Sequence, residues 1–335
     1  MLSRPITKYL LAICLVAALV VVGVGVYVYS DYFLYSSPED VTVEIPKGPS
    51  LNEIAGALEE SGAIKSAKAF VGYVVVHNAE RSLKAGEYEL KAGSGIGDVV
   101  DKIVKGEVVL REITIPEGLT VPQTAELLDE KGVVTKEAFL KAAGDREFIR
   151  AKLGRPVDSV EGYLYPDTYK VEKGITAKEL VARMIARHRE VFRAIDHSGV
   201  DLSSHEIVTL ASIIEKETAV AEERPIISAV LHNRLKLGMR LECDPTVIYG
   251  MGEDFHGNLR KKDLQLESPY NTYVIYGLPP GPISNPGKGS LEAAVNPAPV
   301  DYLYFVSRGD GTHKFSSRYR EHLRAVRKYQ KRRRR

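Results

Sequence analysis

The clearest helical pattern of the chain runs from residue 203 to residue 219. Ser203 can cap the first turn, and Glu206 three residues later completes a capping box. Apolar residues then recur at helical spacing: Ile207, Val208, Leu210, Ala211, Ile213 and Ile214. Because successive residues step by about 100° around a helix, Glu215 and Glu217 fall within this apolar arc. We therefore predict a helix whose apolar face carries two carboxyl groups.

These two acids are the strongest chemical signal in the sequence. A glutamate removed from water keeps its proton above the ordinary pKa of about 4.3, because burial disfavours the charged form. A proton held near neutral pH suits a general acid. A buried acid also suits a structural ion pair, and Arg224 or Arg234 could supply the partner. Periodicity alone leaves catalysis and ion pairing equally open.

An uncharged, apolar run occupies residues 9–29 and is long enough to cross a bilayer as a helix. Arg4 and Lys8 precede it, and acidic residues follow it, so the positive-inside rule predicts a cytoplasmic N-terminus at 1–8 and an extracytoplasmic remainder. A removable signal peptide is the alternative. The run exceeds the usual apolar length of a signal and lacks a clear cleavage site, which favours a retained anchor.

Two later segments share one pattern. Residues 43–64 and 113–134 each contain a short alternating strand, an Ile-Pro-x-Gly turn and a helix closed by a glycine, Gly62 or Gly132. A second helix is expected near Phe70 and Phe139. Two copies indicate a duplicated supersecondary unit rather than a solenoid.

The first copy belongs to a small predicted module at 41–108, after a linker at 30–40. Residues 83–90 are typical of a strand, and residues 94–104 of a helix, which gives an α+β unit. Its strand-helix-helix-strand order suits carbohydrate binding. A spacer that holds the distal part away from the membrane fits the pattern equally well.

The distal part, residues 109–330, is predicted to be a larger mixed α/β domain, in which 109–150 repeats the first unit. Helices are expected at 177–195, 203–217 and 222–237. The intervening loops are rich in Pro, Gly, Asn and Tyr. Such loops hold side chains rigidly, so that little ordering is needed when a ligand binds.

Tyrosines in these loops could provide a sugar-binding surface. The chain has 18 Tyr and no Trp, so Tyr must supply any stacking platform. Asn and Asp side chains could form hydrogen bonds with the ring hydroxyls and acetamido groups of a sugar. A single Tyr is more often a core ring, but the cluster of Tyr163, Tyr169, Tyr270 and Tyr273 favours a ligand site.

Composition narrows the class of protein. In 335 residues, 44% are hydrophobic and 27% are charged, as in an ordinary folded protein. The net charge is +2, but positive charges are concentrated in a basic tail that ends at 331–335. This tail could contact anionic lipid or simply be solvated. Cys14 and Cys243 cannot form a disulfide across the membrane, and the eight His are scattered. We expect no metal, no cofactor and no nucleic-acid partner.

Several motifs together resemble the YceG-like endolytic murein transglycosylases, the MltG family of membrane-anchored bacterial cell-wall enzymes. The resemblance covers the whole chain. Its motifs are Glu161-Gly-Tyr-Leu-Tyr-Pro-Asp-Thr-Tyr, Ala211-Ser-Ile-Ile-Glu-Lys-Glu-Thr, Glu223-Arg-Pro, Asn233-Arg-Leu, Asp244-Pro-Thr-Val-Ile-Tyr-Gly, Tyr270-Asn-Thr-Tyr, Gly277-Leu-Pro-Pro-Gly and Tyr304-Phe-Val.

The resemblance implies an anchored enzyme with a LysM-like module that cuts the MurNAc-GlcNAc bonds of nascent peptidoglycan internally and leaves 1,6-anhydro-MurNAc ends. It implies Glu215 as the catalytic acid, because the first Glu of the Glu-Lys-Glu-Thr stretch has that role in the family. Glycan strands and the cytoplasmic membrane are implied partners, and cell-wall synthases are candidate partners. Supporting or substrate-binding roles carry over to Glu217, Glu161, Tyr163, Asn233, Asp244, Thr246, Tyr270, Asn271 and Tyr273.

The chain departs from the family pattern at two places. Glu242 stands where Gln is usual, followed by Cys243, and Leu323 replaces an expected Asn after His322. Neither change touches Glu215.

One glutamate suffices for a lytic reaction, because the muramoyl C6 hydroxyl replaces water as the nucleophile. A hydrolytic muramidase that uses Glu217, Glu242 or Asp244 as a second carboxylate is one alternative. A catalytically silent, membrane-tethered scaffold that binds glycan is the other.

Overall fold

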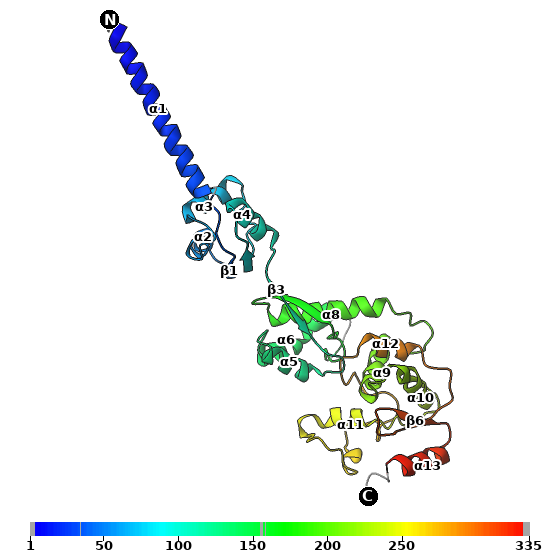
Figure 1. The fold of residues 1–335 in the computed structure, drawn as a ribbon. Coiled ribbons are helices and arrows are strands. Elements are labelled where there is room, and N and C mark those ends of the chain that lie inside the picture. The colour runs from blue at the N-terminus through cyan, green and yellow to red at the C-terminus, as the bar shows by residue number, and fades with distance from the viewer. Residues whose placement is uncertain (1–3, 34, 155–156, 158, 331–335) are drawn as a thin grey trace. The chain divides into compact units, whose positions relative to one another are not determined.

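The computed structural model describes residues 4–33, 35–154, 157 and 159–330 (Figure 1). The chain divides into two compact units. One comprises residues 1–112 and 170–174, and the other comprises 113–169 and 175–335. The predicted basic tail at 331–335 lies outside the described residues.

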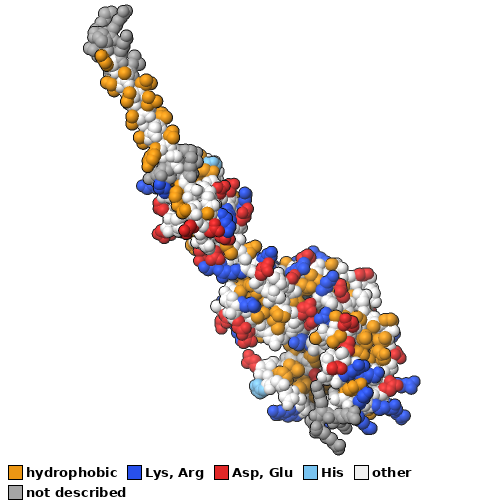
Figure 2. Space-filling model, viewed as in Figure 1, with side chains coloured by type: hydrophobic (Ala, Val, Ile, Leu, Met, Phe, Trp, Pro, Cys, Tyr) orange, Lys and Arg blue, Asp and Glu red, His pale blue; other side chains and the backbone are white. Residues whose placement is uncertain are grey.

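Helix α1 covers Arg4–Phe33 and includes the expected span at 9–29. Its described large apolar side chains are exposed, and they line the helix in Figure 2. The side chains of residues 10, 11, 28 and 29 are not among those described. Over the described part of the chain, no helix is both long enough and apolar enough to cross a membrane. The membrane span is therefore not confirmed and stays a prediction.

The first unit contains the expected strand-helix-helix-strand order. Strand β1 (Val41–Ile45) pairs antiparallel with β2 (Gly86–Leu90), and α2 (Leu51–Glu60), α3 (Ala67–Val76) and α4 (Ile96–Lys105) complete the unit. Ser50 and Glu53 form a capping box on α2. Buried Leu58, Phe70, Tyr88 and Ile103 share one core.

The strand expected at 83–90 is shorter in the structure. It begins at Gly86, which pairs with Ile45, the last residue of β1. Pro46 follows Ile45 and has no N–H to continue the ladder, so residues 83–85 have no strand partner there.

A repeat of this pattern follows, and its helices lie in the second unit. Strand β3 (Leu110–Thr114) leads to α5 (Val121–Glu130) and α6 (Lys136–Ala143), as β1 leads to α2 and α3. Gly62 and Gly132 both have positive φ, 76° and 64°, where glycine is favoured. Helix α7 (Arg146–Leu153) and strand β4 (Thr168–Glu172), which pairs with β3, follow.

Helices make up most of the rest of this unit. They are α8 (Ala177–Arg193), α9 (Ser204–Glu217), α10 (Arg224–Lys236), α11 (Asp244–Met251) and α12 (Lys288–Val295), with short 3-10 turns at Ala221–Glu223, Gly252–Asp254 and Asp263–Gln265. Helix α9 contacts α10, α11 and α12, so its apolar residues form the centre of this core. The α+β class is confirmed in this coarse sense, since the sheets are small and helices dominate.

The C-terminal part forms a small separate layer. Strands β5 (Tyr304–Ser307) and β6 (His313–Ser316) pair antiparallel, and α13 (Tyr319–Tyr329) packs against both. Lys and Arg side chains gather over this region in Figure 2. Strand β5 also contacts α10.

Candidate active site

The two acids of interest lie in the last turn of α9. Ser203 caps the helix and forms the predicted capping box with Glu206. Residues 207–214 are buried, as the periodicity predicts. The helix ends at Glu217 because Thr218 adopts an extended conformation, with φ −147° and ψ 139°. Both carboxyl groups therefore lie at the C-terminal end of α9, next to the loop that follows it.

Glu215 is held by two donors. Its side chain is 6% exposed. The backbone N–H of Gly287, at the start of α12, donates to Oε2 over 3.0 Å, and Arg224 Nη2 lies 3.4 Å from Oε1. The ion-pair alternative considered for this acid thus occurs in the structure. Both carboxylate oxygens are occupied as acceptors.

A third carboxylate joins this group. Arg224 Nη2 also lies 3.3 Å from Oε2 of Glu117, which belongs to the second Ile-Pro-x-Gly turn. Gly287 leaves room for Glu117, because a Cβ at Gly287 would approach Glu117 Oε1 within 1.8 Å. A side chain at this position would therefore displace the Glu117 carboxylate.

These groups line a cleft of about 360 Å³, here called the acid cleft. It is bounded by Glu117, Gly118, Glu215, Lys216, Glu217, Thr218, Ala219 and Arg224. Lys216 closes one side by donating to the carbonyl oxygen of Gly118 over 3.1 Å. The acid cleft contains both acids that the sequence singled out.

Glu217 also lines a second cavity, of about 440 Å³, here called the aromatic cavity. Its lining includes Glu217, Asp244, Tyr273, Tyr304, Tyr319 and His322. The Tyr273 hydroxyl donates to Asp244 Oδ1 over 2.7 Å. The structure thus brings together three residues that the resemblance marked as functional, Glu217, Asp244 and Tyr273. Glu217 stands where the two hollows meet.

The surroundings of Glu217 favour its protonated form. Burial raises the pKa of Glu217 to about 7, and the charge of Asp244 adds to the rise. A hydrogen bond from the Cys243 thiol and the charge of Arg234 act in the opposite direction. Burial also raises the pKa of Cys243, so that it stays a thiol and a donor. Near neutral pH, Glu217 can both give and take a proton.

Arg234 supports the floor of the aromatic cavity. It is 7% exposed, and its Nε donates to the carbonyl oxygen of Leu303 over 2.7 Å. Its Nη1 donates to the carbonyl oxygens of Arg240 and Leu241 and to Glu242 Oε2, at 3.0, 3.0 and 2.9 Å. Glu242 has φ 52°, an unfavourable value for a residue with a side chain. Glu242, at the position where Gln was expected, thus ion-pairs with a buried arginine.

Glu161 lies away from both hollows. It is 3% exposed, and its two oxygens accept from the N–H of Val121 at 3.2 and 3.1 Å. Asn285 Nδ2 and the Tyr249 hydroxyl donate to it at 3.3 and 3.5 Å. Burial raises the pKa of Glu161 to about 7. Its contacts join the start of α5 to helix α11 and to the loop that contains Asn285, which is a structural role.

Two of the clustered tyrosines are core rings. Tyr163 is fully buried, and its hydroxyl lies 2.6 Å from Nδ1 of His205. Tyr169 is 9% exposed, and its hydroxyl donates to the carbonyl oxygen of Tyr165. Neither ring presents an exposed face to a ligand. Tyr270 is partly buried against Tyr249, with 4.8 Å between the ring centres.

Three polar residues expected in the site instead brace the loops around it. Asn233 donates to two carbonyl oxygens of the segment 300–302, each at 3.0 Å. Asn271 is fully buried and donates to two carbonyl oxygens of the segment 264–266, at 3.1 and 2.8 Å. Thr246 is fully buried and donates to the carbonyl oxygen of Cys243 over 2.6 Å. All three satisfy backbone groups of loops, as buried polar side chains usually do.

Sequence reasoning did not assign a site role to Glu117 or Gly287, and it considered Arg224 only as an ion-pair partner. One signal for Glu117 was present in the repeat. The two Ile-Pro-x-Gly turns carry Lys47 in the first copy and Glu117 in the second. The two turns therefore carry opposite charges at this position.

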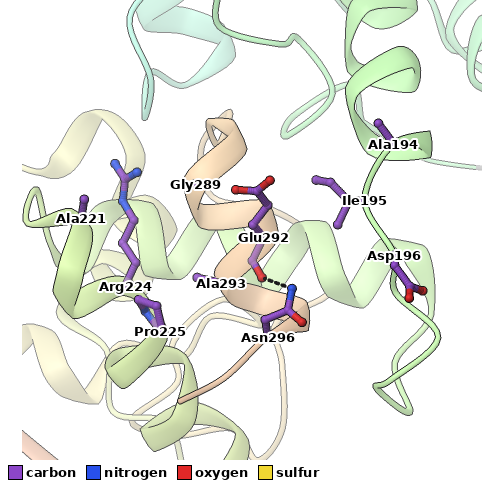
Figure 3. A pocket seen from close by; sticks show the side chains of 10 residues that line it. All are labelled: Ala194, Ile195, Asp196, Ala221, Arg224, Pro225, Gly289, Glu292, Ala293 and Asn296. Carbon is purple, nitrogen blue, oxygen red and sulfur yellow. Dashed lines mark hydrogen bonds between the residues drawn. The ribbon is translucent and has the colours of Figure 1, made fainter.

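A third cavity, of about 480 Å³, also includes Arg224 in its lining (Figure 3). Glu292 of α12 and Asn296, which follows that helix, line it together with Asp196 after α8 and Pro225 of α10. Asn296 Nδ2 donates to the carbonyl oxygen of Glu292 over 3.2 Å. None of the residues that the sequence predicted for the site lines this cavity.

Comparison with known proteins agrees with the resemblance. The model of the YceG-like family matches residues 43–328. An endolytic murein transglycosylase of Bacillus subtilis is 33% identical over 326 residues, which cover 91% of this chain and 90% of that protein. An endolytic murein transglycosylase of Streptococcus pneumoniae is 33% identical over 304 residues, or 81% of this chain, which spans 55% of that longer protein.

A solved structure extends the likeness to the fold. The crystal structure of a yceG-like protein from Listeria monocytogenes is 36% identical and matches with a TM-score of 0.57, over 85% of this chain and 98% of that one. The region matched by the family model contains both the paired acids of α9 and most of the aromatic cavity. This chain therefore belongs to the YceG-like family.

Proposed function

We propose that this chain is a lytic transglycosylase that cleaves the MurNAc-GlcNAc bond within nascent peptidoglycan strands and thereby ends their elongation. The names of its relatives support this activity. The observation that carries the proposal is a proton-bearing glutamate, Glu217, at the junction of two hollows that could hold sugar on both sides of the broken bond. An enzyme that cuts inside a strand needs room on both sides.

The reaction requires one group that first gives and then takes a proton. The acid protonates the glycosidic oxygen while the bond between that oxygen and C1 of the muramoyl sugar breaks. The resulting carboxylate removes the proton from the C6 hydroxyl of the same sugar, and O6 bonds to C1. The proton returns to the carboxyl group, and no water is consumed. The product is a 1,6-anhydro end.

The local geometry favours Glu217, rather than the Glu215 that the resemblance implied, as this acid. Glu217 lines both hollows and has a pKa of about 7. Glu215 is tied to the Gly287 N–H and to Arg224, which leaves neither oxygen free. We assign Glu215 the role of a fixed carboxylate that stabilises the positive charge developing at C1. Asp244 tunes the proton affinity of Glu217 through its charge.

The remaining parts of the proposal rest on the sequence. The uncharged run at 9–29 and the exposed apolar side chains of α1 support a single membrane anchor with the N-terminus in the cytoplasm. Residues 41–108 would form a LysM-like glycan-binding module, and residues 109–330 the catalytic domain. Cell-wall synthases, which produce nascent strands, are the proposed protein partners.

End-group analysis of the products tests this function. The full chain in detergent is incubated with uncrosslinked nascent glycan in water enriched in ¹⁸O, and the products are examined by mass spectrometry. Anhydro ends without ¹⁸O are expected. Reducing ends that carry ¹⁸O would instead identify a muramidase that uses a second carboxylate. Glycan binding without any cleavage would identify a scaffold.

A further inference from the structure

The aromatic cavity has a wall that neither the acids nor the sequence motifs explain. Helix α13 contributes Tyr319 and His322 to it, from a segment more than a hundred residues after Glu217. The helix packs against β5 and β6, and these strands supply Tyr304 and His313 to the same cavity. The last helix of the described chain is thus part of a hollow that opens beside the proposed catalytic acid.

Three rings form a continuous cluster in this wall. The Tyr304 ring centre lies 5.2 Å from that of His322, in a stacked arrangement, and 5.6 Å from that of Tyr319. The guanidinium of Arg234 lies 5.2 Å from the centre of the Tyr304 ring. Arg234 and His322 therefore hold Tyr304 in place. Rings fixed in this way can receive the apolar face of a sugar with little loss of conformational entropy.

Tyr319 is the available ring of the cluster. It is 59% exposed, although it lines the cavity and adjoins Tyr304. Core packing does not explain so large an exposed aromatic surface. Tyr combines an apolar face with a hydroxyl at its edge, which matches the two kinds of surface on a sugar.

His322 provides an unsatisfied polar atom. Its Nδ1 is buried and has no hydrogen-bond partner among the described residues. Burial lowers the pKa of His322, and the nearby Arg234 acts in the same direction, so the ring is neutral at pH 7. A neutral imidazole nitrogen either donates to a carbonyl oxygen or accepts from a hydroxyl or amide. A buried polar atom without a partner is costly, and a ligand could satisfy it.

The charges in this hollow favour an uncharged ligand. Glu242 is neutralised by its ion pair with Arg234 at 2.9 Å, and Asp244 accepts from Tyr273. The remaining negative charge of Asp244 opposes the carboxylates of a muramoyl stem peptide. An N-acetylglucosamine unit carries no charge and offers both an acetamido group and an apolar ring face.

We propose that the aromatic cavity is a subsite for an N-acetylglucosamine unit of the glycan strand, with Tyr319 as its stacking ring and His322 Nδ1 as the hydrogen-bond partner of the acetamido group. This subsite rests on the proposed function, since it places one sugar beside Glu217. It makes α13 a part of substrate binding rather than a terminal appendage.

Binding of small oligosaccharides tests the subsite without requiring cleavage. The full chain in detergent is titrated by calorimetry with chitotriose, an oligomer of N-acetylglucosamine, and with cellotriose, which lacks acetamido groups. Mass spectrometry checks that the sugars stay intact. Chitotriose should bind at least several-fold more tightly than cellotriose. Equal binding of the two sugars, or no binding of chitotriose, would overturn the proposal.

Two variants and one control locate the binding. His322→Phe keeps a ring beside Tyr304 but removes the nitrogen, and it should weaken chitotriose binding by roughly 3- to 10-fold. Tyr319→Ala should weaken it by about 10-fold. Leu323→Ala on the same helix, at a residue that is 37% exposed, should bind like wild type. Melting temperatures of all three should match wild type within about 3 °C.

The outcomes separate this proposal from the enzyme assignment. If wild type cleaves glycan but both variants bind chitotriose like wild type, the subsite is wrong and the function stands. If both variants lose binding while wild type never cleaves glycan, the subsite stands and the function is wrong. In a cleaving enzyme, KM for glycan should rise in the two variants by a factor similar to the loss of binding.

Discussion

Cleavage by this chain should slow as the pH rises through about 7, because the proposed acid must hold its proton when the glycosidic bond breaks. Glu217 has a pKa of about 7. A group with that pKa is roughly 90% protonated at pH 6 and roughly 10% at pH 8, so kcat/KM should fall about 10-fold between them. A glutamate at its ordinary pKa would already have lost its proton near pH 5.5.

Two neighbours of Glu217 should move this midpoint in opposite directions. The Cys243 thiol donates to the charged form and lowers the pKa, so Cys243→Ala should shift the midpoint upward. The charge of Asp244 raises the pKa, so Asp244→Asn should shift the midpoint downward. Opposite shifts from adjacent residues are difficult to produce by general damage to the fold.

Initial rates at low concentrations of nascent glycan, from pH 5 to pH 9 at constant ionic strength, measure these midpoints. Thermal melts at each pH identify any loss of folded protein. A rate that falls with a midpoint near 4.5, or that rises between pH 6 and pH 8, would refute the assignment of Glu217 as the acid. The same conclusion would follow if both variants shifted the midpoint in one direction.

Three further expectations concern the groups around the site. Arg234→Ala removes four hydrogen bonds of a buried guanidinium, so it should lower the free energy of unfolding, measured in urea, by about 3–5 kcal/mol. The control Lys236→Ala, at an exposed residue of the same helix, should change it by less than about 0.5 kcal/mol. Gly287→Ala should displace the Glu117 side chain, which is 46% exposed and can move. The rate of glycan cleavage should therefore fall roughly 10-fold, with little change in melting temperature. Gly56→Ala, at an unobstructed site in α2, is the control. Folding raises the pKa of Glu161 from 4.5 to about 7, so Glu161 stabilises the fold most below pH 4.5. This contribution to the free energy of unfolding should decline by about 3 kcal/mol between pH 4.5 and pH 7. Chemical unfolding of Glu161→Gln should show no such decline.

Local signals predicted the elements of this fold well. The capping box of α9, the glycines that close α2 and α5, and the spacing of apolar residues all act within one or two turns of helix. These interactions depend on neighbours in the sequence, so the sequence alone reveals them. The pairing of β3 with β4 joins segments more than fifty residues apart and was not predicted.

The roles of the site residues depended on contacts that periodicity cannot show. Glu215 and Glu217 are equivalent in the pattern of α9, yet one meets Gly287 N–H, 72 residues away, and the other meets Cys243. Tyr163 and Tyr273 occur in similar loops, but one is a core ring and the other lines the aromatic cavity. Tertiary contacts distinguish the members of each pair. The resemblance to a family distinguished the two acids as well, but it gave the catalytic role to Glu215.

The most direct test compares Glu217→Gln and Glu215→Gln for the formation of anhydro ends from nascent glycan. Loss of the general acid should lower the rate of Glu217→Gln by about 10²- to 10⁴-fold, with its melting temperature preserved. Glu215→Gln keeps the acid and should still form anhydro ends, at a reduced rate. Anhydro ends at the wild-type rate from Glu217→Gln, or their complete loss only in a folded Glu215→Gln, would contradict the role of Glu217.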